Sequence, residues 1–312
     1  MTADLDRLLE RSSRTFALSI PLLPPPTRRE VSVAYLLFRI ADTFEDSTRW
    51  EPARRIAALA EFAGLLRKPS RRGAEDAARR WVADPPCDQE GYLELLRETA
   101  DVLDDFQSLS PAAIAEIREH VVASADGMAR FVERISPAGD LRLADVADLK
   151  AYCYVVAGIV GEMLTSLFLL GRPELSEAAP FLSARAARFG EGLQLVNILK
   201  DAGSDRSEGR TYLPDGVSRD EVFALARADL GEASEYVLEL QKAGAPRGVV
   251  GFTALPVELA WETLDRVQIH GPGSKVPRAR VFQIVHRLNR DLDRNRPAVR
   301  PRRSNSTESI GS

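Results

Sequence analysis

The sequence almost completely lacks the alternating runs of β-branched residues that form strands. Alanine, leucine, arginine and glutamate dominate instead, and these residues favour helices. Prolines divide the chain into segments of helical length. The pattern predicts an all-α protein with helices at 28–46, 52–67, 74–83, 89–107, 111–134, 145–170, 179–201, 219–242, 247–269 and 277–294.

Composition limits the class of protein. The chain has 312 residues, of which 45% are hydrophobic and 28% are charged, as in ordinary globular proteins. The net charge of −4 and the lack of a basic stripe argue against a nucleic-acid partner. No shift in composition marks a domain boundary, so we expect one domain over residues 1–294. The remaining segment, 295–312, is rich in proline, arginine and serine, which predicts a disordered tail.

The cysteines and the apolar segments indicate the compartment. Cys87 and Cys153 cannot form a disulfide framework and fit a reducing compartment. The first ten residues are polar and charged, so we expect no secretory signal and a cytoplasmic protein. The most apolar stretch, 154–170, contains Glu162 and ends at Gly171. This stretch predicts a buried helix rather than a transmembrane anchor.

Two pairs of aspartates are spaced four residues apart in segments predicted to be helical, and the first pair is Asp42 and Asp46. On a helix this spacing stacks both carboxylates on one face, where they repel each other unless a cation binds them. Tyr35 and Arg39 fall within roughly 60° of the pair on a helical wheel. The four side chains form a polar stripe between apolar neighbours. An exposed helix face with an Arg39–Asp42 ion pair is the alternative interpretation.

The second pair, Asp201 and Asp205, belongs to a similar stripe with Gln194 and Asn197, within about 80° on the wheel. The stretch 202–204 is weakly helix-forming because it contains Gly203 and Ser204, so the motif is expected near a helix end. A helix terminus that runs into a charged loop is the alternative. Two stripes with the same acid spacing favour a facing pair of acidic clusters that hold Mg²⁺ ions, which in turn hold a diphosphate.

Cations surround the second motif. Arg206 and Arg210 follow it, Lys200 precedes it, and Tyr212 comes shortly after. Together with Arg39 these cations could neutralise phosphate oxygens that the metal ions leave exposed. An ordinary basic loop is the alternative for this segment.

Gly158 and Gly161 lie inside the apolar segment that is predicted to be helical. Each costs about 1 kcal/mol in a helix interior relative to alanine, so something must need close approach there. Packing against a neighbouring helix is the favoured explanation, and contact with a long apolar ligand is the other.

Motifs for other common chemistries are missing from the sequence. No glycine-rich dinucleotide motif, phosphate-binding loop or serine nucleophile motif is present. The three histidines are scattered and do not have the spacing of a zinc site.

Five stretches carry a resemblance to a known family. In this order and at these separations, the chain resembles the squalene/phytoene synthases, which join two prenyl diphosphates head to head. The similarity runs from about residue 13 to residue 287. The stretches that carry it are 13–18, 39–46, 152–161, 194–201 and 209–214.

The resemblance implies a fold and a metal site. The fold would be a single-domain, isoprenoid-synthase-type helical bundle around a large central cavity. Mg²⁺ would be held by Asp42 and Asp46 on one wall and by Asp201 and Asp205 on the other. These four carboxylates would act as both metal ligands and catalytic residues.

The resemblance also assigns roles that the helical wheel does not. Arg14 and Arg39 match diphosphate-binding arginines, and Phe16 matches a residue that lines the cavity. Tyr152 matches a tyrosine that handles protons or cations and is expected to be catalytic. The residues expected to bind substrate are Arg14, Phe16, Tyr35, Arg39, Gln194, Asn197, Lys200, Arg206, Arg210 and Tyr212.

Within the family, segments 42–46 and 252–256 are more similar to squalene synthases than to phytoene synthases. Lys200 and Val257 depart from the usual arginine and glutamine. The membrane anchor at the C-terminus of eukaryotic squalene synthases has no counterpart here, which implies a soluble, bacterial form.

The first hypothesis is therefore that two farnesyl diphosphates are joined to squalene through presqualene diphosphate, with Mg²⁺. NADPH would be needed only if squalene is the product. The alternatives are a phytoene or dehydrosqualene synthase, an enzyme that stops at presqualene diphosphate or hydroxysqualene, and a non-catalytic member that binds prenyl diphosphates or a partner subunit. A peripheral membrane contact for product release is also left open.

Overall fold

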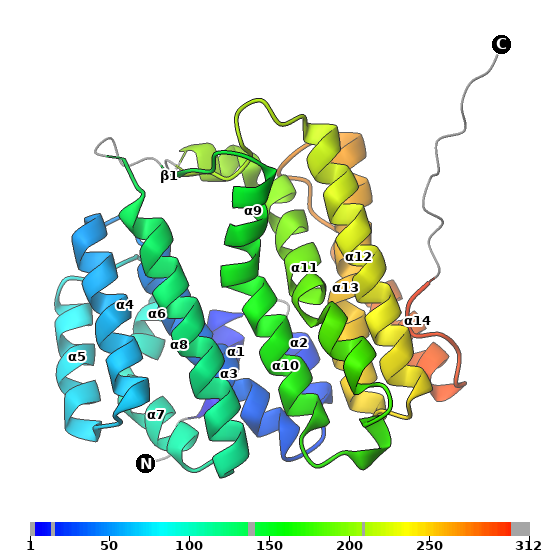
Figure 1. The fold of residues 1–312 in the computed structure, drawn as a ribbon, viewed down its shortest axis with the longest axis horizontal. Helices are drawn as coiled ribbons and strands as arrows, with labels where there is room; N and C mark the ends of the chain where they lie inside the picture. The colour runs from blue at the N-terminus through cyan, green and yellow to red at the C-terminus, as the bar shows by residue number, and fades with distance from the viewer. Residues whose placement is uncertain (1–3, 14–15, 137–140, 208–209, 301–312) are drawn as a thin grey trace.

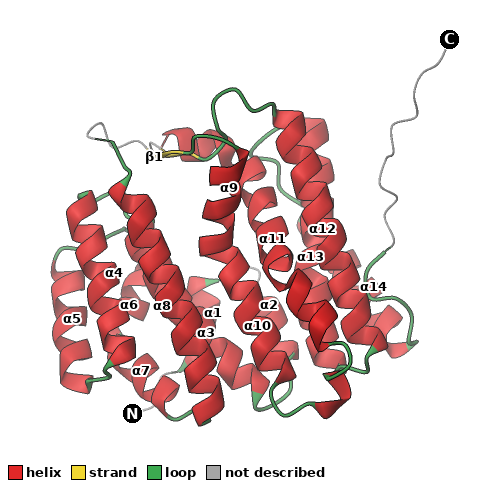
Figure 2. Ribbon diagram, in the orientation of Figure 1, coloured by secondary structure: helices red, strands yellow, loops and turns green. Residues whose placement is uncertain are grey.

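The computed structural model describes residues 4–13, 16–136, 141–207 and 210–300, without the side chains of 204–207 and 210. These residues are almost entirely helical, so the predicted all-α class is confirmed (Figures 1 and 2). The only strands among them are β1 (Leu141–Arg142) and β2 (Arg210–Thr211), which form a short parallel pair.

Most of the predicted helices are present, and their ends differ from the predicted ends by a few residues. Capping serines fix two of the starts, because Ser110 and Ser218 each accept a hydrogen bond from the backbone N–H three residues later. The confirmed helices are α3 (Thr27–Glu45), α4 (Pro52–Arg67), α5 (Arg71–Ala83), α8 (Pro111–Glu133), α11 (Ala179–Ser207), α12 (Arg219–Lys242), α13 (Arg247–His270) and α14 (Arg278–Asp293).

Two predicted helices are interrupted. The segment 89–107 forms α6 (Glu90–Arg97) and α7 (Thr99–Gln107), because the backbone leaves the helical region at the residue between them, where ψ is 11°. The segment 145–170 contains a π-helical turn, and its parts are α9 (Val146–Cys153), η2 (Tyr154–Gly158) and α10 (Ile159–Leu169).

The short elements near the N-terminus and before α11 were not predicted. Leu8 and Leu9 of α1 are buried against α3 and α6, so packing stabilises a helix too short to be marked by its own pattern. The unpredicted elements are α1 (Leu5–Ser12), α2 (Phe16–Ser19), η1 (Ile20–Leu22) and η3 (Pro173–Leu175).

The helices form two groups joined by α10. Helices α4 to α8 lie on the left of Figure 1, and α11 to α14 lie on the right. Helix α10 packs against α3 and α8 of the first group and against α11 of the second. The two helices that carry the paired aspartates, α3 and α11, therefore flank a common neighbour.

The chain past α14 is ordered further than predicted. Residues 295–300 belong to the expected tail, but Ala298 and Val299 are buried. The Ala298 N–H donates to Gln241 Oε1 at 2.9 Å, and the Arg300 N–H donates to Glu258 Oε1 at 2.8 Å. Side-chain acceptors on α12 and α13 therefore hold this segment in place, and composition alone does not reveal them. The rest of the expected tail, 301–312, lies outside the described residues.

The glycines in the apolar segment mark a close contact between helices, as favoured from the sequence. A Cβ added at Gly161 would collide with the backbone oxygen of Ala186 on α11. On the other side, a Cβ at Gly190 would collide with the backbone oxygen of Ala157. Glycines on both partners thus allow the backbone of η2 and α10 to touch that of α11, which fixes α9 and its Tyr152 relative to α11.

The close contact at Gly161 predicts how a substitution there changes the free energy of unfolding. Gly161→Ala should lower the free energy of unfolding by about 2 kcal/mol, because two backbones must separate to admit the methyl group. Gly231→Ala in α12 is the matched control, since no atom lies within 4 Å of the added Cβ. It should raise stability by about 0.5–1 kcal/mol. Urea unfolding measures both, and equal stability of the two variants would contradict the close contact.

One helical stretch among the described residues, Val146–Leu169, is long and apolar enough to cross a membrane. In its most apolar part, 61% is buried inside the protein. The burial agrees with the prediction of a buried helix.

Candidate active site

The polar stripe predicted on α3 is present. Arg39 Nη1 lies 3.3 Å from Asp42 Oδ2, and Arg39 Nη2 donates to the Tyr35 hydroxyl at 3.1 Å. That hydroxyl donates to the Ser12 carbonyl at 3.1 Å. The exposed fractions of the Arg39 and Asp42 side chains are 24% and 28%, and the apolar residues between them are buried. Arg39 and Asp42 therefore lie in a partly enclosed surface, whereas Asp46 at the end of the helix is exposed. The ion pair of the alternative interpretation is present, and the partial burial of its two side chains argues against a fully solvated face.

Tyr92 on α6 is a site residue that the sequence did not reveal. The guanidinium of Arg39 lies 5.5 Å from the ring centre of Tyr35 and 5.4 Å from that of Tyr92. Two aromatic faces therefore hold the cation in addition to its ion pair. No motif surrounds Tyr92, so only the packing of α6 against α3 brings it to this place.

The negative charge of the Asp42 carboxylate is only partly neutralised by its surroundings. Burial raises the pKa of its carboxyl to about 6, Arg39 opposes the rise, and Asp46 adds to it. Asp46 lies one residue beyond the end of α3, and its N–H donates to the Asp42 carbonyl at 2.8 Å. Two carboxylates one turn apart, one of which holds its proton unusually tightly, are a donor set that suits a hard divalent cation such as Mg²⁺.

Tyr152 connects the end of α3 to the segment that follows α11. Its ring stacks on Tyr212 with the ring centres 4.7 Å apart and meets the edge of Phe131 at 5.2 Å. Burial is the main cause that raises the pKa of Tyr152 well above its ordinary value, and the carboxylates of Glu45 and Asp46 contribute. The tyrosine is therefore close to the acidic end of α3. The phenol stays protonated at neutral pH.

On α11 the predicted stripe is only partly described. The helix continues to Ser207, past the predicted end at 201, so both aspartates lie one turn apart in one helix. Lys200 Nζ lies 3.1 Å from Asp201 Oδ2, and Gln194 is half-buried. Asn197 is exposed although the apolar residues around it are buried.

A chain of aromatic rings extends from the α3 stripe. Phe16 lies 5.5 Å from Tyr35 and 6.3 Å from Phe252, measured between ring centres. Phe168 continues the chain, 5.9 Å from Phe252. Phe16 is thus beside the stripe, and Phe252 belongs to the segment that the sequence had marked as similar to squalene synthases.

Several predicted residues cannot be placed. Arg14 lies outside the described residues, as do the side chains of Asp205, Arg206 and Arg210. Among the side chains that are described, no three histidines, cysteines or acids group as metal ligands. The predicted four-carboxylate site and the central cavity therefore stay predictions.

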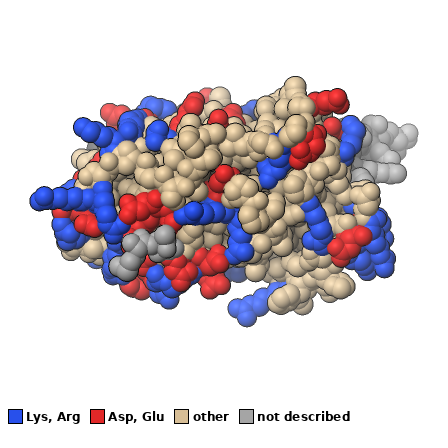
Figure 3. Space-filling model, turned by 90° about the horizontal axis from the view of Figure 1, so that it is seen from below, with Lys and Arg blue, Asp and Glu red and all other residues tan. Residues whose placement is uncertain are grey.

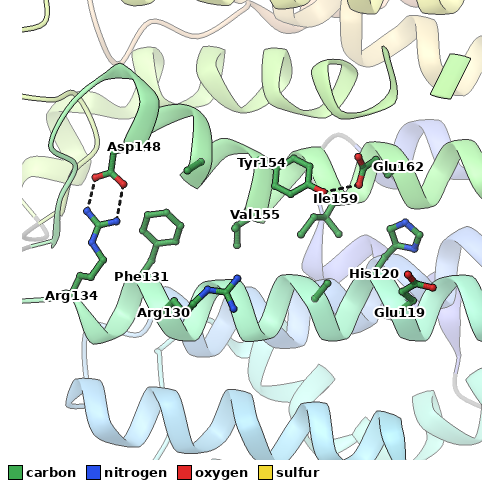
Figure 4. Close-up of a pocket in the computed structure, with 12 residues that line it drawn as sticks. Glu119, His120, Arg130, Phe131, Arg134, Asp148, Tyr154, Val155, Ile159 and Glu162 are labelled. Carbon is green, nitrogen blue, oxygen red and sulfur yellow. Dashed lines mark hydrogen bonds and ion pairs between the residues drawn. The ribbon is translucent and has the colours of Figure 1, made fainter. Parts of the chain in front are cut away.

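A separate cleft of about 620 Å³ lies between α8 and the helices α9 and α10 (Figure 4). Two pairs of its polar groups are in contact: Arg134 Nη1 donates to Asp148 at 2.7 Å, and the Tyr154 hydroxyl donates to Glu162 at 3.0 Å. None of the predicted site residues lines it. Its only link to the site is Phe131, whose ring contacts Tyr152.

Known proteins are similar to this chain in sequence and in fold. A family model described as squalene/phytoene synthase matches residues 9–284. The chain belongs to the squalene/phytoene synthase family. It is therefore related to enzymes that transfer prenyl groups. Squalene synthase of Eremothecium gossypii is 31% identical over 221 residues, which cover 68% of this chain and 46% of that protein. The chain spans less than half the length of this relative.

Solved structures share the fold of this family member. The complex of TcSQS with a ligand superposes with a TM-score of 0.68 at 24% identity, covering 93% of this chain and 89% of that one. A dehydrosqualene synthase in complex with a ligand gives a TM-score of 0.54 at 20% identity, covering 93% and 95%. The isoprenoid-synthase helical fold expected from the sequence is thereby confirmed.

Proposed function

We propose that this family member joins two farnesyl diphosphates head to head, through presqualene diphosphate, to form squalene, with Mg²⁺ and NADPH. The observation that carries the proposal is the meeting of three elements at Tyr152. The acidic end of α3 lies close enough to raise its pKa, and Tyr212, which follows α11, stacks on its ring. The first aspartate motif therefore lies beside Tyr152, and the segment that follows the second motif stacks on the same ring.

The residues of the α3 stripe bind and orient the diphosphate. Mg²⁺ bound at Asp42 and Asp46 would neutralise the charge that develops on the leaving diphosphate. Arg39 is fixed by the rings of Tyr35 and Tyr92 and by the Tyr35 hydroxyl, so it presents its remaining N–H groups without reorganisation. Asp201 and Lys200 on α11 would complete the same site from the other side.

Aromatic rings protect the allylic cation that forms when the diphosphate departs. Tyr152 is buried and neutral, so its ring face can stabilise a cation while its hydroxyl holds a proton. Phe16 and Phe252 extend the apolar wall beyond the α3 stripe. Water is thus kept from the cation until the second prenyl chain attacks it.

Product analysis tests this function. Purified protein is incubated with farnesyl diphosphate and Mg²⁺, with and without NADPH, and the products are identified by mass. We expect a hydrocarbon of squalene mass only when NADPH is present, and presqualene diphosphate to accumulate without it. Geranylgeranyl diphosphate in a parallel reaction tests the main alternative, phytoene synthesis.

Other products would decide between the remaining candidates. A product of dehydrosqualene mass without NADPH would show a dehydrosqualene synthase, and hydroxysqualene or presqualene diphosphate alone would show an enzyme that stops early. Turnover of geranylgeranyl diphosphate in preference to farnesyl diphosphate would contradict the proposed substrate. Prenyl diphosphate binding without turnover would indicate a non-catalytic member.

A further inference from the structure

An apolar groove of about 340 Å³ lies between α14 and the elements α2, η1 and α13. Leucines and valines form most of its walls, and Gly251 lets Leu22 and Leu292 approach its floor. The groove has an exposed apolar rim, because Phe282 is 72% exposed and Leu18 is 53% exposed. Two of the four large exposed hydrophobic side chains in the described part of the chain thus border this one groove.

Basic side chains accompany the exposed phenylalanine. Arg278, Phe282, His286 and Arg290 follow one another at intervals of four residues, so they form one exposed row along α14. The row contains no acid. Figure 3 looks up at the lower end of the bundle and shows, on the side of α12 to α14, a wide area without charged side chains that is bordered mainly by Lys and Arg.

The exposed row on α14 carries a net positive charge, because the other charged residues of the helix pair elsewhere. The helix contains four arginines and two aspartates, in a chain whose net charge is −4. Arg280 and Arg287 pair with Glu262 and Glu258 on α13, and Asp293 pairs with Arg247. Among the described residues, the two arginines of the exposed row have no acidic partner.

The groove also adjoins the aromatic wall of the proposed active site. Leu18 is two residues from Phe16 on α2, and Gly251 precedes Phe252 on α13. The rings of Phe16 and Phe252 are 6.3 Å apart. A single layer of two helices therefore separates the exposed groove from the residues that would enclose a prenyl chain.

We propose that this groove and the α14 row, defined by Leu18, Phe282, Arg278 and Arg290, dock onto a bilayer that contains anionic lipids. Phe282 and Leu18 enter the interface between headgroups and acyl chains, and the arginines contact lipid phosphates. The charge of the row selects an anionic surface over a neutral one. If the proposed function holds, the C30 product leaves through the aromatic wall into the bilayer instead of into water; the docking itself does not depend on that function.

Vesicle co-sedimentation of the full chain tests the docking. Wild-type protein should bind vesicles of phosphatidylcholine with added phosphatidylglycerol and bind pure phosphatidylcholine weakly. Phe282→Ser should weaken binding to the anionic vesicles about tenfold. Arg278→Gln and Arg290→Gln should each weaken it about fivefold. All three positions are exposed, so we expect the variants to fold and to release diphosphate in detergent at the wild-type rate.

Two matched variants control for general effects. Ile269→Ser removes an apolar side chain that is 74% exposed, about as much as Phe282. Ile269 lies about 20 Å further along α13 than Leu255, which lines the groove. Arg79→Gln removes an exposed arginine from α5, at the opposite end of the molecule (Figure 1). Both should bind vesicles as the wild type does.

Three results would overturn the proposal. In the first, the groove variants bind vesicles as well as the wild type does. In the second, the control variants lose as much vesicle binding as the groove variants do. In the third, the wild type binds no vesicles and is a dimer, which Phe282→Ser converts to a monomer. A protein that binds vesicles but shows no turnover in detergent would count against the proposed function and leave the docking intact.

Discussion

Replacing Asp42 with asparagine should lower the rate of Mg²⁺-dependent diphosphate release at least about a thousandfold, while it makes the metal-free protein more stable. The loss of activity follows from the loss of an anionic metal ligand. The gain in stability follows from burial, which raises the pKa of this carboxyl from 3.8 to about 6. The charged carboxylate is thus a cost to the fold that Arg39 offsets only in part and that a bound cation would offset further.

The sign of the pH dependence follows from that pKa. The folded protein holds the Asp42 proton more tightly than the unfolded chain does, so its contribution to stability falls as pH rises from about 4 to about 6. At pH 8 the full penalty is present. Urea unfolding at pH 8 without metal should therefore show Asp42→Asn to be about 1–2 kcal/mol more stable than the wild type. The partial exposure of the side chain keeps this figure below the full pKa shift.

Asp88→Asn provides the control, because the Asp88 side chain is 90% exposed and pairs with an arginine on the surface. It should change stability by less than about 0.5 kcal/mol and leave diphosphate release unchanged. An Asp42→Asn protein that turns over at the wild-type rate would exclude Asp42 as a metal ligand. One that is less stable at pH 8 would contradict the buried, poorly neutralised carboxylate.

Arg39→Met should lower diphosphate release about a hundredfold and destabilise the protein by about 1–3 kcal/mol at pH 8. The variant leaves Asp42 without its cation 3.3 Å away and removes the group that Tyr35 and Tyr92 enclose. Because Arg39 lowers the pKa of Asp42, its loss should raise that pKa further. Protons should then compete with Mg²⁺ at a higher pH, and the acidic limb of the pH–rate profile should move upward.

Arg28→Met on the same helix is the matched control for this variant. Arg28 pairs with Asp6 in an exposed position, so its loss should cost less than about 1 kcal/mol and leave the pH profile unchanged. Arg39→Lys should fall between the wild type and Arg39→Met, since lysine keeps the charge but not the planar group between the rings. A pH profile of Arg39→Met that matches the wild type would separate Arg39 from Asp42 and contradict the arrangement on α3.

The α3 part of the site was predictable because local spacing determines it. The intervals of four, three and four residues from Tyr35 to Asp46 fix one helical face whatever the rest of the chain does. The buried apolar residues between them hold this helix against the core and leave Arg39 and Asp42 only partly exposed. Resemblance to the family added Phe16 and Tyr152, which no periodicity marks.

Other features depend on contacts between distant segments and were missed. Tyr92 comes to Arg39 only because α6 packs on α3, and residues 295–300 are held by Gln241 and Glu258 on two other helices. The π-helical turn at 154–158 and the break at Glu98 were missed as well. Sequence periodicity carries no information about such contacts.

We propose that α3 and α11 contribute to one metal-dependent diphosphate site. Titration calorimetry with inorganic diphosphate, with and without Mg²⁺, tests it on the wild type, Asp42→Asn, Asp201→Asn and the double variant. We expect Mg²⁺-dependent binding by the wild type, and we expect each single variant to lose nearly as much affinity as the double variant, because the two residues act on one site. Independent, additive losses, or binding by the wild type that does not need Mg²⁺, would contradict a shared site.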